Sequence, residues 1–335
     1  MSDRRPNRPS VSVIVPCRNE IHRLPEFVTS LERQTLQPNE IVIADGMSTD
    51  GTREWLSELS VRHPRVEMVD NASQIVPAAL NVALAVANGE LVARMDTHAD
   101  YADDYLERIV DFMVEHPEVA AAGGTMETVG TGRWGKEIAA TLRRPHGLGG
   151  ARHRVGGHAG PITHVFSGCY RRSAIEAAGG WDDRLRANED YEADLRVAAT
   201  SGLVWLVTDA GTAWHVRESL PQLARQMWRY GYHKALTMYL HPSSIKLRQL
   251  APPVLTLTLF LGPLMHRQLR LLPPAYLALS AALGACAAQH DGADPVRGAC
   301  VPATVHLSWG AGLITGLVRF AAEARRGTVV TIGIA

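Results

Sequence analysis

The fold is decided by residues 11–60, VSVIVPCRNEIHRLPEFVTSLERQTLQPNEIVIADGMSTDGTREWLSELS. Val11 to Pro16 is a β-branched run, and Leu24 to Gln34 resembles an amphipathic helix. A second strand is expected at Glu40–Asp45 and a second helix from Thr52 to Ser60. Strands that alternate with helices in this way predict a parallel sheet flanked by helices, the α/β class.

The alternation continues, with a strand predicted at Val66–Val69, a helix at Val76–Ala87 and a strand at Glu90–Met95. Each strand ends in polar residues, and ligands of such sheets bind beyond the carboxyl ends of the strands. Three polar strand ends are therefore expected to converge on one crevice: residues 16–20, 45–52 and 96–98.

The third of these ends, Asp96-Thr97-His98, combines a carboxylate with an imidazole. Side chains two apart on an extended segment point the same way, so the two could share one divalent ion. The tripeptide could also simply begin a turn after the strand. The first alternative predicts a metal that holds a diphosphate.

Several motifs resemble those of family 2 glycosyltransferases, which have the nucleotide-diphospho-sugar transferase (GT-A) fold. Residues 13–20, VIVPCRNE, resemble V-x-I-P-x-x-N-E, and residues 43–52, IADGMSTDGT, resemble V-D-D-x-S-x-D-G-T. Asp96-Thr97-His98 stands where the family has D-x-D, and residues 179–182 and 188–190 resemble its G-G-F-D and E-D elements. The likeness covers residues 10 to about 235 and is strongest to the bacterial exopolysaccharide branch, such as the succinoglycan-assembly transferases.

This resemblance implies a donor site with Pro16, Arg18, Glu20 and Asp45 around the nucleotide. An Asp carboxylate can accept the imide N–H of a base, and a Glu can accept ribose hydroxyls. Glu20 and Asp45 could instead be a helix N-terminal charge or part of an Asx-turn. Asn81 is expected to line the nucleotide too, with a solvent-facing helix position as the alternative.

The resemblance also implies a divalent cation, Mn or Mg, that neutralises the leaving diphosphate. Asp96 and His98 are the predicted ligands, and the change from D-x-D to D-x-H favours Mn somewhat, because imidazole is the softer ligand. His215 resembles the third ligand of some GT-A enzymes, or it is a histidine at the edge of the core.

Asp190 is the general base that the resemblance implies: it would deprotonate the acceptor hydroxyl, which attacks the anomeric carbon and inverts its configuration. Residues 188–190 could also simply cap a helix over Tyr191–Ala199. The predicted donor or acceptor contacts are Trp181, Asp182, Glu189, Gln222 and Arg225. Gln222-x-x-Arg225 partly resembles the Q-x-x-R-W element of processive relatives, but the Trp is displaced to Trp228, so processivity is not expected.

Two phosphate-loop motifs are rejected. Residues 130–135 match G-x-G-x-x-G, but they lie outside the opening strand and helix and no acidic residue follows about 20 positions later, so a flexible loop is expected. Lys136 follows a glycine but precedes Glu137, where a P-loop has Ser or Thr.

Charge and cysteine content argue against a nucleic-acid-binding protein, a zinc ribbon and a disulfide-stabilised fold. Among 335 residues, Lys and Arg together number 34, as do Asp and Glu, so no basic surface points to nucleic acid. Four cysteines lie far apart without a C-x-x-C pair, against a zinc ribbon or a disulfide framework. Residues 1–9 form a polar tail without a secretory signal, so the bulk of the chain is expected in the cytoplasm.

The hydropathy of the chain changes beyond the predicted catalytic domain, residues 10–240. In the membrane-associated region predicted over 241–335, residues 250–265, 271–290 and 299–318 contain no Asp, Glu, Lys or Arg. The last two runs are long enough to cross a bilayer, whereas the first is short, contains three prolines and is expected to be re-entrant or interfacial. Basic residues on both sides of this pair of spans predict cytoplasmic flanks. Buried helices of a soluble domain are the alternative.

The sequence thus predicts an inverting, metal-dependent glycosyltransferase at the cytoplasmic face of a bacterial inner membrane. Its predicted substrates are a nucleotide-sugar donor and a lipid-linked or polysaccharide acceptor. One alternative is a polyprenyl-phosphate glycosyl synthase. Another is a catalytically idle, membrane-tethered subunit that binds sugar nucleotides.

Overall fold

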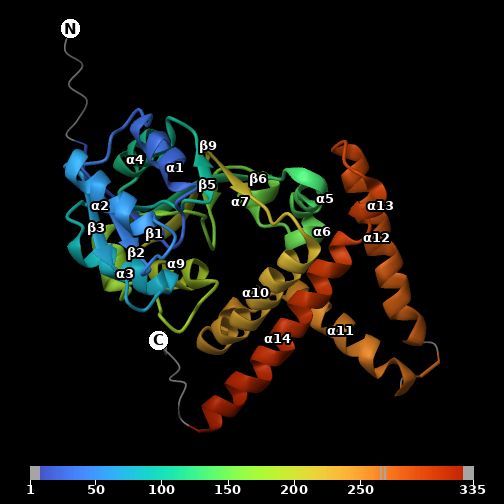
Figure 1. Ribbon diagram of the computed structural model, residues 1–335. Helices are drawn as coiled ribbons and strands as arrows, with labels where there is room; N and C mark the ends of the chain where they lie inside the picture. The colour runs from blue at the N-terminus through green and yellow to red at the C-terminus, as the bar shows by residue number, and fades with distance from the viewer. Residues whose placement is uncertain (1–7, 265, 268, 327–335) are drawn as a thin grey trace. The chain divides into compact units, whose positions relative to one another are not determined.

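The computed structural model describes residues 8–264, 266–267 and 269–326, so most of the predicted polar tail and Met265 of the first apolar run lie outside the described residues. The chain divides into two compact units (Figure 1). The first unit comprises residues 1–127 and 156–214, and the second comprises 128–155 and 215–335. Residues 215–240, predicted as the end of the catalytic domain, are thus grouped with the C-terminal helices.

A nine-stranded sheet forms the framework of the first unit within the described residues, in the order β3-β2-β1-β4-β8-β6-β9-β5, with β7 also paired to β9. Its strands are β1 (Val11–Cys17), β2 (Glu40–Asp45), β3 (Val66–Asp70), β4 (Leu91–Arg94), β5 (Ala99–Tyr101), β6 (Val119–Val129), β7 (Gly160–Pro161), β8 (Cys169–Arg171) and β9 (Leu203–His215). β1 pairs in parallel with both β2 and β4, and β2 pairs in parallel with β3.

The other strands make the sheet a mixed one. β8 pairs antiparallel with β4 and β6, and β5 pairs antiparallel with β9. The predicted α/β class is confirmed, and its parallel half is the part that the alternating pattern of residues 11–95 predicts. The antiparallel half has no helix between β4 and β5, so the same pattern could not indicate it.

Helices cover the sheet because its central strands are apolar on both faces. Val13 and Val15 of β1 belong to one core cluster, while Ile14 belongs to the other. The first cluster includes residues of α1 (Leu24–Glu32), α2 (Thr52–Arg62) and α4 (Tyr105–Glu115). The second includes residues of α3 (Val76–Val86), α8 (Arg172–Ala177) and α9 (Glu189–Thr200). The parallel strands thus have buried sides and polar carboxyl ends.

One predicted loop is wrong. Residues 130–135 do not form a flexible loop, because α5 (Gly132–Leu142) begins inside them. A Cβ on Gly130 would overlap the carbonyl oxygen of Gly135, so these two glycines allow close backbone packing at the start of the helix. The G-x-G-x-x-G spacing is explained by that packing.

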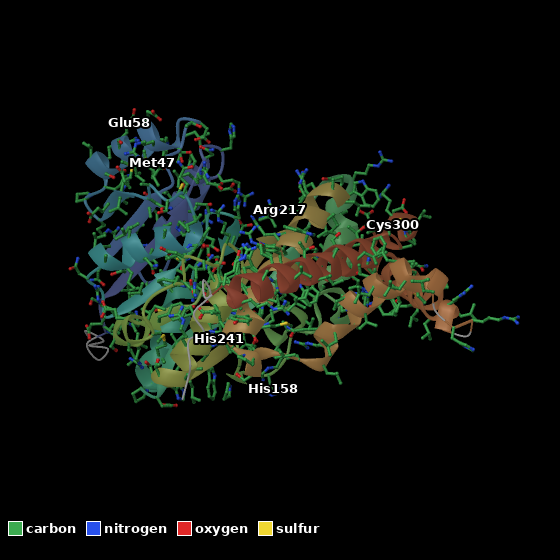
Figure 2. The ribbon with its side chains drawn as sticks, turned by 90° about the horizontal axis from the view of Figure 1, so that it is seen from below. Met47, Glu58, His158, Arg217, His241 and Cys300 are labelled. Carbon is green, nitrogen blue, oxygen red and sulfur yellow. The ribbon has the colours of Figure 1, made fainter. Side chains whose placement is uncertain are left out.

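The second unit is helical. Besides α5 it contains α6 (Pro145–Leu148), α7 (Arg152–Val155), α10 (Leu220–Leu240), α11 (Ala251–Leu261), α12 (Leu272–His290), α13 (Pro295–Gly298) and α14 (Val301–Arg325), with short 3-10 turns at 242–244, 247–250, 262–264 and 269–271. α10 and α14 run side by side (Figure 1). Side-chain nitrogen and oxygen atoms are dense over the first unit and sparse along α14 (Figure 2).

The predicted spans at 271–290 and 299–318 correspond to α12 and α14. Among the described helices, one stretch, Pro295–Arg325, is long and apolar enough to cross a membrane, with a mean hydropathy of 1.3 in its most apolar window. Core helices of soluble proteins also meet this test, so the number of spans stays a prediction.

Candidate active site

Asp96 lies just beyond β4 and is held by an arginine two residues before it. The guanidinium of Arg94 donates from Nε to Oδ1 of Asp96 at 2.9 Å and from Nη2 to Oδ2 at 3.0 Å. The Arg94 side chain is only 8% exposed. The backbone N–H of Asp96 donates to the Tyr101 hydroxyl at 2.8 Å. The carboxylate of Asp96 is therefore fixed in direction before any ligand arrives.

Arg94 also connects β4 to the start of α9. Its Nη1 donates to Oε1 of Glu189 at 3.1 Å, and this carboxylate is also buried. Burial raises the pKa of Glu189, and the charge of Asp190 raises it further, while Arg94 opposes both. One buried cation thus links the predicted metal ligand with the predicted acid pair.

His98 and Glu20 come from two different strand ends and meet. Nε2 of His98 lies 2.8 Å from Oε1 of Glu20, and the His98 side chain is 53% exposed. The backbone N–H of Glu20 donates to the Thr52 hydroxyl at 2.8 Å. Two of the three predicted motifs therefore contact each other directly at the carboxyl edge of the sheet.

Asp45, at the end of β2, is fully buried but not fully hydrogen bonded. Its Oδ2 accepts from the Ser48 N–H at 3.1 Å and from Nη1 of Arg53 at 2.8 Å. Its Oδ1 is buried and has no hydrogen-bond partner among the described residues. A buried acceptor without a donor is costly, so this oxygen fits a ligand that brings an N–H, such as a pyrimidine or purine base.

The loops around these side chains contain strained residues. Asn19 and Met47 have φ of 55° and 57°, and Ser167 and Asn188 have φ of 47° and 63°. Positive φ in non-glycine residues is unfavourable and concentrates at functional sites. Beside them, the stem of Arg18 lies over Gly46, where an added Cβ would be 3.1 Å from it, and Pro16 is half-buried at the end of β1.

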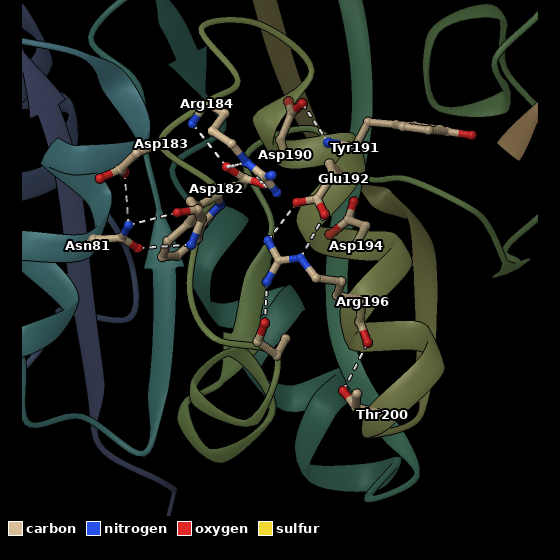
Figure 3. A network of polar contacts seen from close by, with 12 residues as sticks. Asn81, Asp182, Asp183, Arg184, Asp190, Tyr191, Glu192, Asp194, Arg196 and Thr200 are labelled. Carbon is tan, nitrogen blue, oxygen red and sulfur yellow. Dashed lines mark hydrogen bonds and ion pairs between the residues drawn. The ribbon is translucent and has the colours of Figure 1, made fainter. Parts of the chain in front are cut away.

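The Asn81 side chain holds the loop that contains Asp182 and Asp183, with a hydrogen bond to Oδ1 of Asp183 at 3.2 Å (Figure 3). The Asn81 amide donates to the Trp181 carbonyl at 2.7 Å and accepts from the Trp181 N–H at 2.8 Å. The Trp181 ring is buried and meets Tyr170 edge to face. Arg184 donates to both carboxylate oxygens of Asp182. The predicted contacts of Asn81, Trp181 and Asp182 with donor or acceptor stay predictions, and Asn81 visibly fixes the loop over 180–183.

Asp190 projects from the first turn of α9 (Figure 3). Its Oδ1 accepts from the Tyr191 N–H at 2.7 Å, and its Oδ2 lies 3.7 Å from Nε2 of His164. Asn188 takes the N-cap position that the sequence predicts, but its side chain makes no capping hydrogen bond. Asp190 is partly exposed and adjoins the buried Arg94 and Glu189 network, as a base at the edge of a binding site must.

The described residues of the first unit offer some of the ligands that a divalent cation needs, but not a complete set. A carboxylate has about four lone-pair positions, and Arg94 uses one on each oxygen of Asp96, so further positions remain for a metal. His98 is accessible and contacts Glu20, but residues 97–98 form a turn and not the extended segment predicted to align His98 with Asp96. Within the described residues, however, three carboxylate, histidine or cysteine side chains do not already converge as a metal cage. His215, Gln222 and Arg225 belong to the second unit, and their predicted roles stay predictions.

The second unit contains a cavity of about 1030 Å³. Apolar side chains of α11 and α14 line it, including Leu259, Phe260 and Leu307, together with the polar side chains of Arg217, Gln222, Arg225 and Arg229. Arg217, labelled in Figure 2, precedes α10 and is exposed. An apolar cavity with guanidinium groups suits an anionic amphiphile.

Sequence reasoning missed Arg94, His164 and Asp194. Asp190 and Asp194 are four apart on a helix and so share a face, which could have indicated that both carboxylates serve one site. Arg94 stands two before Asp96 and could have been paired with it by the same strand alternation that paired Asp96 with His98. His164 lies in an irregular segment, and no local pattern indicates it.

This chain is similar in sequence to several known proteins. The family model of glycosyl transferase family 2 matches residues 12–179. The succinoglycan biosynthesis protein ExoA of Rhizobium meliloti is 31% identical over 92% of this chain and 95% of its own length. The dolichyl N-acetyl-alpha-D-glucosaminyl phosphate 3-beta-D-2,3-diacetamido-2,3-dideoxy-beta-D-glucuronosyltransferase of Methanococcus voltae is 23% identical over 68% of this chain and 73% of its own length.

Two solved structures share the fold. One is the mannosyltransferase PcManGT of Pyrobaculum calidifontis in complex with GDP-Man and Mn²⁺, with a TM-score of 0.60 and 21% identity over 93% of this chain and 88% of that one. The other is GalNAc-T7 with UDP, GalNAc and Mn²⁺, with a TM-score of 0.51 and 17% identity over 70% of this chain and 51% of that one.

Proposed function

Since this chain belongs to glycosyl transferase family 2, we propose that it transfers a sugar from a nucleotide diphosphate donor with inversion and with a divalent cation. The observation that carries the proposal is the buried link from Asp96 through Arg94 to Glu189, with Asp190 next in the chain. It holds the predicted diphosphate side and the predicted base in one rigid group. The fold neighbours with GDP-Man or UDP and Mn²⁺ support the donor class and the cation.

The base, the ribose and the diphosphate of the donor each have a proposed partner among the residues of the first unit. The free, buried Oδ1 of Asp45 accepts an N–H of the base, and Glu20 accepts ribose hydroxyls. Asp96 and His98 would hold the cation, and a bound cation supplies Lewis-acid stabilisation of the leaving diphosphate. Two hydrogen bonds from Arg94 fix the direction of the Asp96 carboxylate.

Asp190 acts on the acceptor. Its carboxylate takes the proton of the acceptor hydroxyl, and the oxygen attacks the anomeric carbon on the face opposite the departing phosphate. The bond from that carbon to the phosphate oxygen breaks, and its electron pair leaves with the nucleotide diphosphate. A single displacement of this kind inverts the anomeric configuration, and general base assistance is typically worth ~10²–10⁴ in rate.

The acceptor is proposed to be lipid-linked. The cavity of the second unit joins apolar walls to several arginines, which suits a lipid chain with a phosphate or diphosphate head. Large apolar side chains nearby are exposed to solvent, including Leu259, Phe260 and Leu264, as expected at a membrane surface.

We place the enzyme at the cytoplasmic face of the inner membrane. A reporter fused after Ala335 should be active in the cytoplasm, and a periplasmic signal would contradict the two-span topology.

The same cavity also favours a second candidate, transfer to a polyprenyl phosphate itself. A phosphate nucleophile is already ionised and needs less help from a base. The effect of Asp190→Asn separates the two, because it should be tolerated if the acceptor is a phosphate and severe if the acceptor is a sugar hydroxyl.

The test is donor turnover by the purified full chain, measured as release of UDP or GDP from a panel of sugar nucleotides with Mn²⁺ or Mg²⁺. Wild type should release nucleotide only with a cation, and Asp96→Ala should lower the rate by about a hundredfold or more. Asp190→Asn should lower kcat by ~10²–10⁴. Asp209→Asn, the same change at an exposed carboxylate on β9, should behave as wild type. Absence of turnover with every donor would favour the idle-subunit alternative.

A further inference from the structure

Behind Asp190 stands a histidine that a second carboxylate holds in place. His164 has Nδ1 at 2.8 Å from Oδ2 of Asp194 and Nε2 at 3.7 Å from Oδ2 of Asp190. The two carboxylates lie one turn apart on α9, so the imidazole spans the gap between them. The order is carboxylate, imidazole, carboxylate, with only the first carboxylate facing the proposed acceptor.

Asp194 is positioned to orient this imidazole. Its side chain is fully buried. Besides His164, its Oδ2 accepts from the Val165 N–H at 3.0 Å, and its Oδ1 accepts from the Tyr170 hydroxyl at 2.8 Å. Burial raises the pKa of Asp194, and the hydrogen bond from His164 opposes that effect. Three donors fix this carboxylate, which in turn fixes the ring.

The orientation selects one tautomer. Nδ1 of His164 donates to Asp194, so in the neutral ring the lone pair is on Nε2, the atom that faces Asp190. Other titratable groups near the ring include Tyr191, whose ring meets His164 edge to face, and Tyr170, which donates to Asp194. The charge of the Arg94 guanidinium interacts with Asp190. Nε2 is thus a proton acceptor turned toward the base.

We propose that His164 is the proton carrier of this site: it takes from Asp190 the proton that Asp190 removes from the acceptor, and Asp194 positions it. This proposal rests on the proposed function. The O–H bond of the acceptor breaks and its proton passes to Asp190, then from Asp190 to Nε2 of His164. Asp190 returns to the carboxylate form, and the imidazolium, stabilised by Asp194, later releases the proton to water. Proton transfer across the 3.7 Å separation requires one bridging water or a closer approach of the two side chains.

The sign of the pH dependence follows. At low pH the imidazole already holds a proton and cannot accept another, so the carrier works only above its protonation midpoint. Without His164, Asp190 alone limits the rate, and a carboxylate titrates at lower pH than an imidazole. Removal of His164 should therefore lower kcat and move the acid limb of the kcat profile to lower pH. A merely structural role would lower kcat without moving that limb.

The first experiment compares pH profiles of kcat for release of UDP from UDP-glucose with Mn²⁺, or of GDP from GDP-mannose if that is the donor. His164→Gln and Asp194→Asn should lower kcat roughly tenfold or more, move the acid limb by at least about one pH unit, and leave the donor KM unchanged. His63→Gln, an exposed histidine after α2, is the matched control and should change neither. An acid limb that stays in place in His164→Gln overturns the proposal and leaves the proposed function intact.

A second measurement does not need turnover. The exchange of the imidazole C2–H with deuterium, followed by mass spectrometry across pH, reports the protonation midpoint of His164 in the folded full chain. Asp190→Asn removes one of the two charges that favour the imidazolium and should move this midpoint to lower pH. If the midpoint in Asp190→Asn equals that in wild type, Asp190 and His164 do not share a proton and the proposal fails. If wild type turns over no donor, the proposed function fails, and this exchange experiment still decides the link between the two residues.

Discussion

Arg94 holds together carboxylates from two distant parts of the chain. Asp96 and Glu189 are 93 residues apart and both contact its guanidinium, in a place where the Arg94 and Glu189 side chains are 8% and 10% exposed. Burial and the charge of Asp190 raise the pKa of Glu189, the charge of Asp96 adds to this, and the Arg94 guanidinium opposes all three. A planar guanidinium with five donors can bind Asp96 and Glu189 at once, which an ammonium group cannot do with the same geometry.

Replacement of Arg94 tests this role. Arg94→Met should lower the free energy of unfolding by ~3–5 kcal/mol, because it leaves buried carboxylates without their cation. Arg94→Lys keeps the charge but loses the two-point contact, so its free energy of unfolding should lie between those of Arg94→Met and wild type. Chemical denaturation measures both. Arg108→Met removes an exposed pairing with Asp104 and Asp209 and should stay within about 0.5 kcal/mol of wild type. Equal stability of Arg94→Met and Arg108→Met would contradict the account.

For single residues, the sequence indicates those that belong to contiguous motifs. Glu20, Asp45, Asp96 and Asp190 all stand at the carboxyl end of a predicted strand or at the start of a predicted helix, and the structure places them there. Contacts between motifs could not be predicted. The pairing of His98 with Glu20 and of His164 with Asp190 depends on how the loops close, which local patterns do not encode.

α10 and α14 of the second unit pack against each other at a row of glycines. A Cβ on Gly231 of α10 would overlap the carbonyl oxygen of Trp309, and one on Gly312 of α14 would overlap that of Trp228. Gly316, one turn after Gly312, meets Tyr232 in the same way. Small residues four apart let two helix backbones approach closely, in membranes and in water.

Gly312→Leu should separate α10 from α14. The added side chain has no space without a shift of backbone, so a loss of ~1–3 kcal/mol in the free energy of unfolding is expected, with the arginines of α10 displaced from the cavity. The measurement is thermal or chemical unfolding of the full chain. Gly262→Ala is the matched control, since nothing lies within 4 Å of an added Cβ there. A Gly312→Leu variant as stable as Gly262→Ala would show that the two helices do not pack at these glycines.

Most elements of the first unit could be predicted from the sequence. β2 has the predicted bounds, and β1, α1, α2, β3 and α3 end within a few residues of prediction, because each is a continuous run with one periodicity. β5, β7 and β8 are two or three residues long and pair antiparallel, so their sequences contain too little pattern to indicate them. α5 was missed because its glycines indicated a loop, while packing of the backbone decided otherwise.

At the scale of the molecule, the two units have different chemistry. The first has a sheet with polar, strained strand ends and the residues proposed for donor binding and base catalysis. The second has apolar helices, exposed large hydrophobic side chains and a cavity with arginines. A transferase whose donor is soluble and whose acceptor is lipid-linked needs both kinds of surface, and the balanced overall charge conceals this division.

The proposed reaction is a single displacement at the anomeric carbon with Asp190 as the base. The most direct test is the anomeric configuration of the newly transferred sugar, read by proton NMR from the product of an α-linked sugar nucleotide before any anomer can equilibrate. The account predicts a β-linked product with wild type, and a β-linked product at a rate lowered by ~10²–10⁴ with Asp190→Asn. An α-linked product would mean two displacements or a front-side mechanism and would contradict the account.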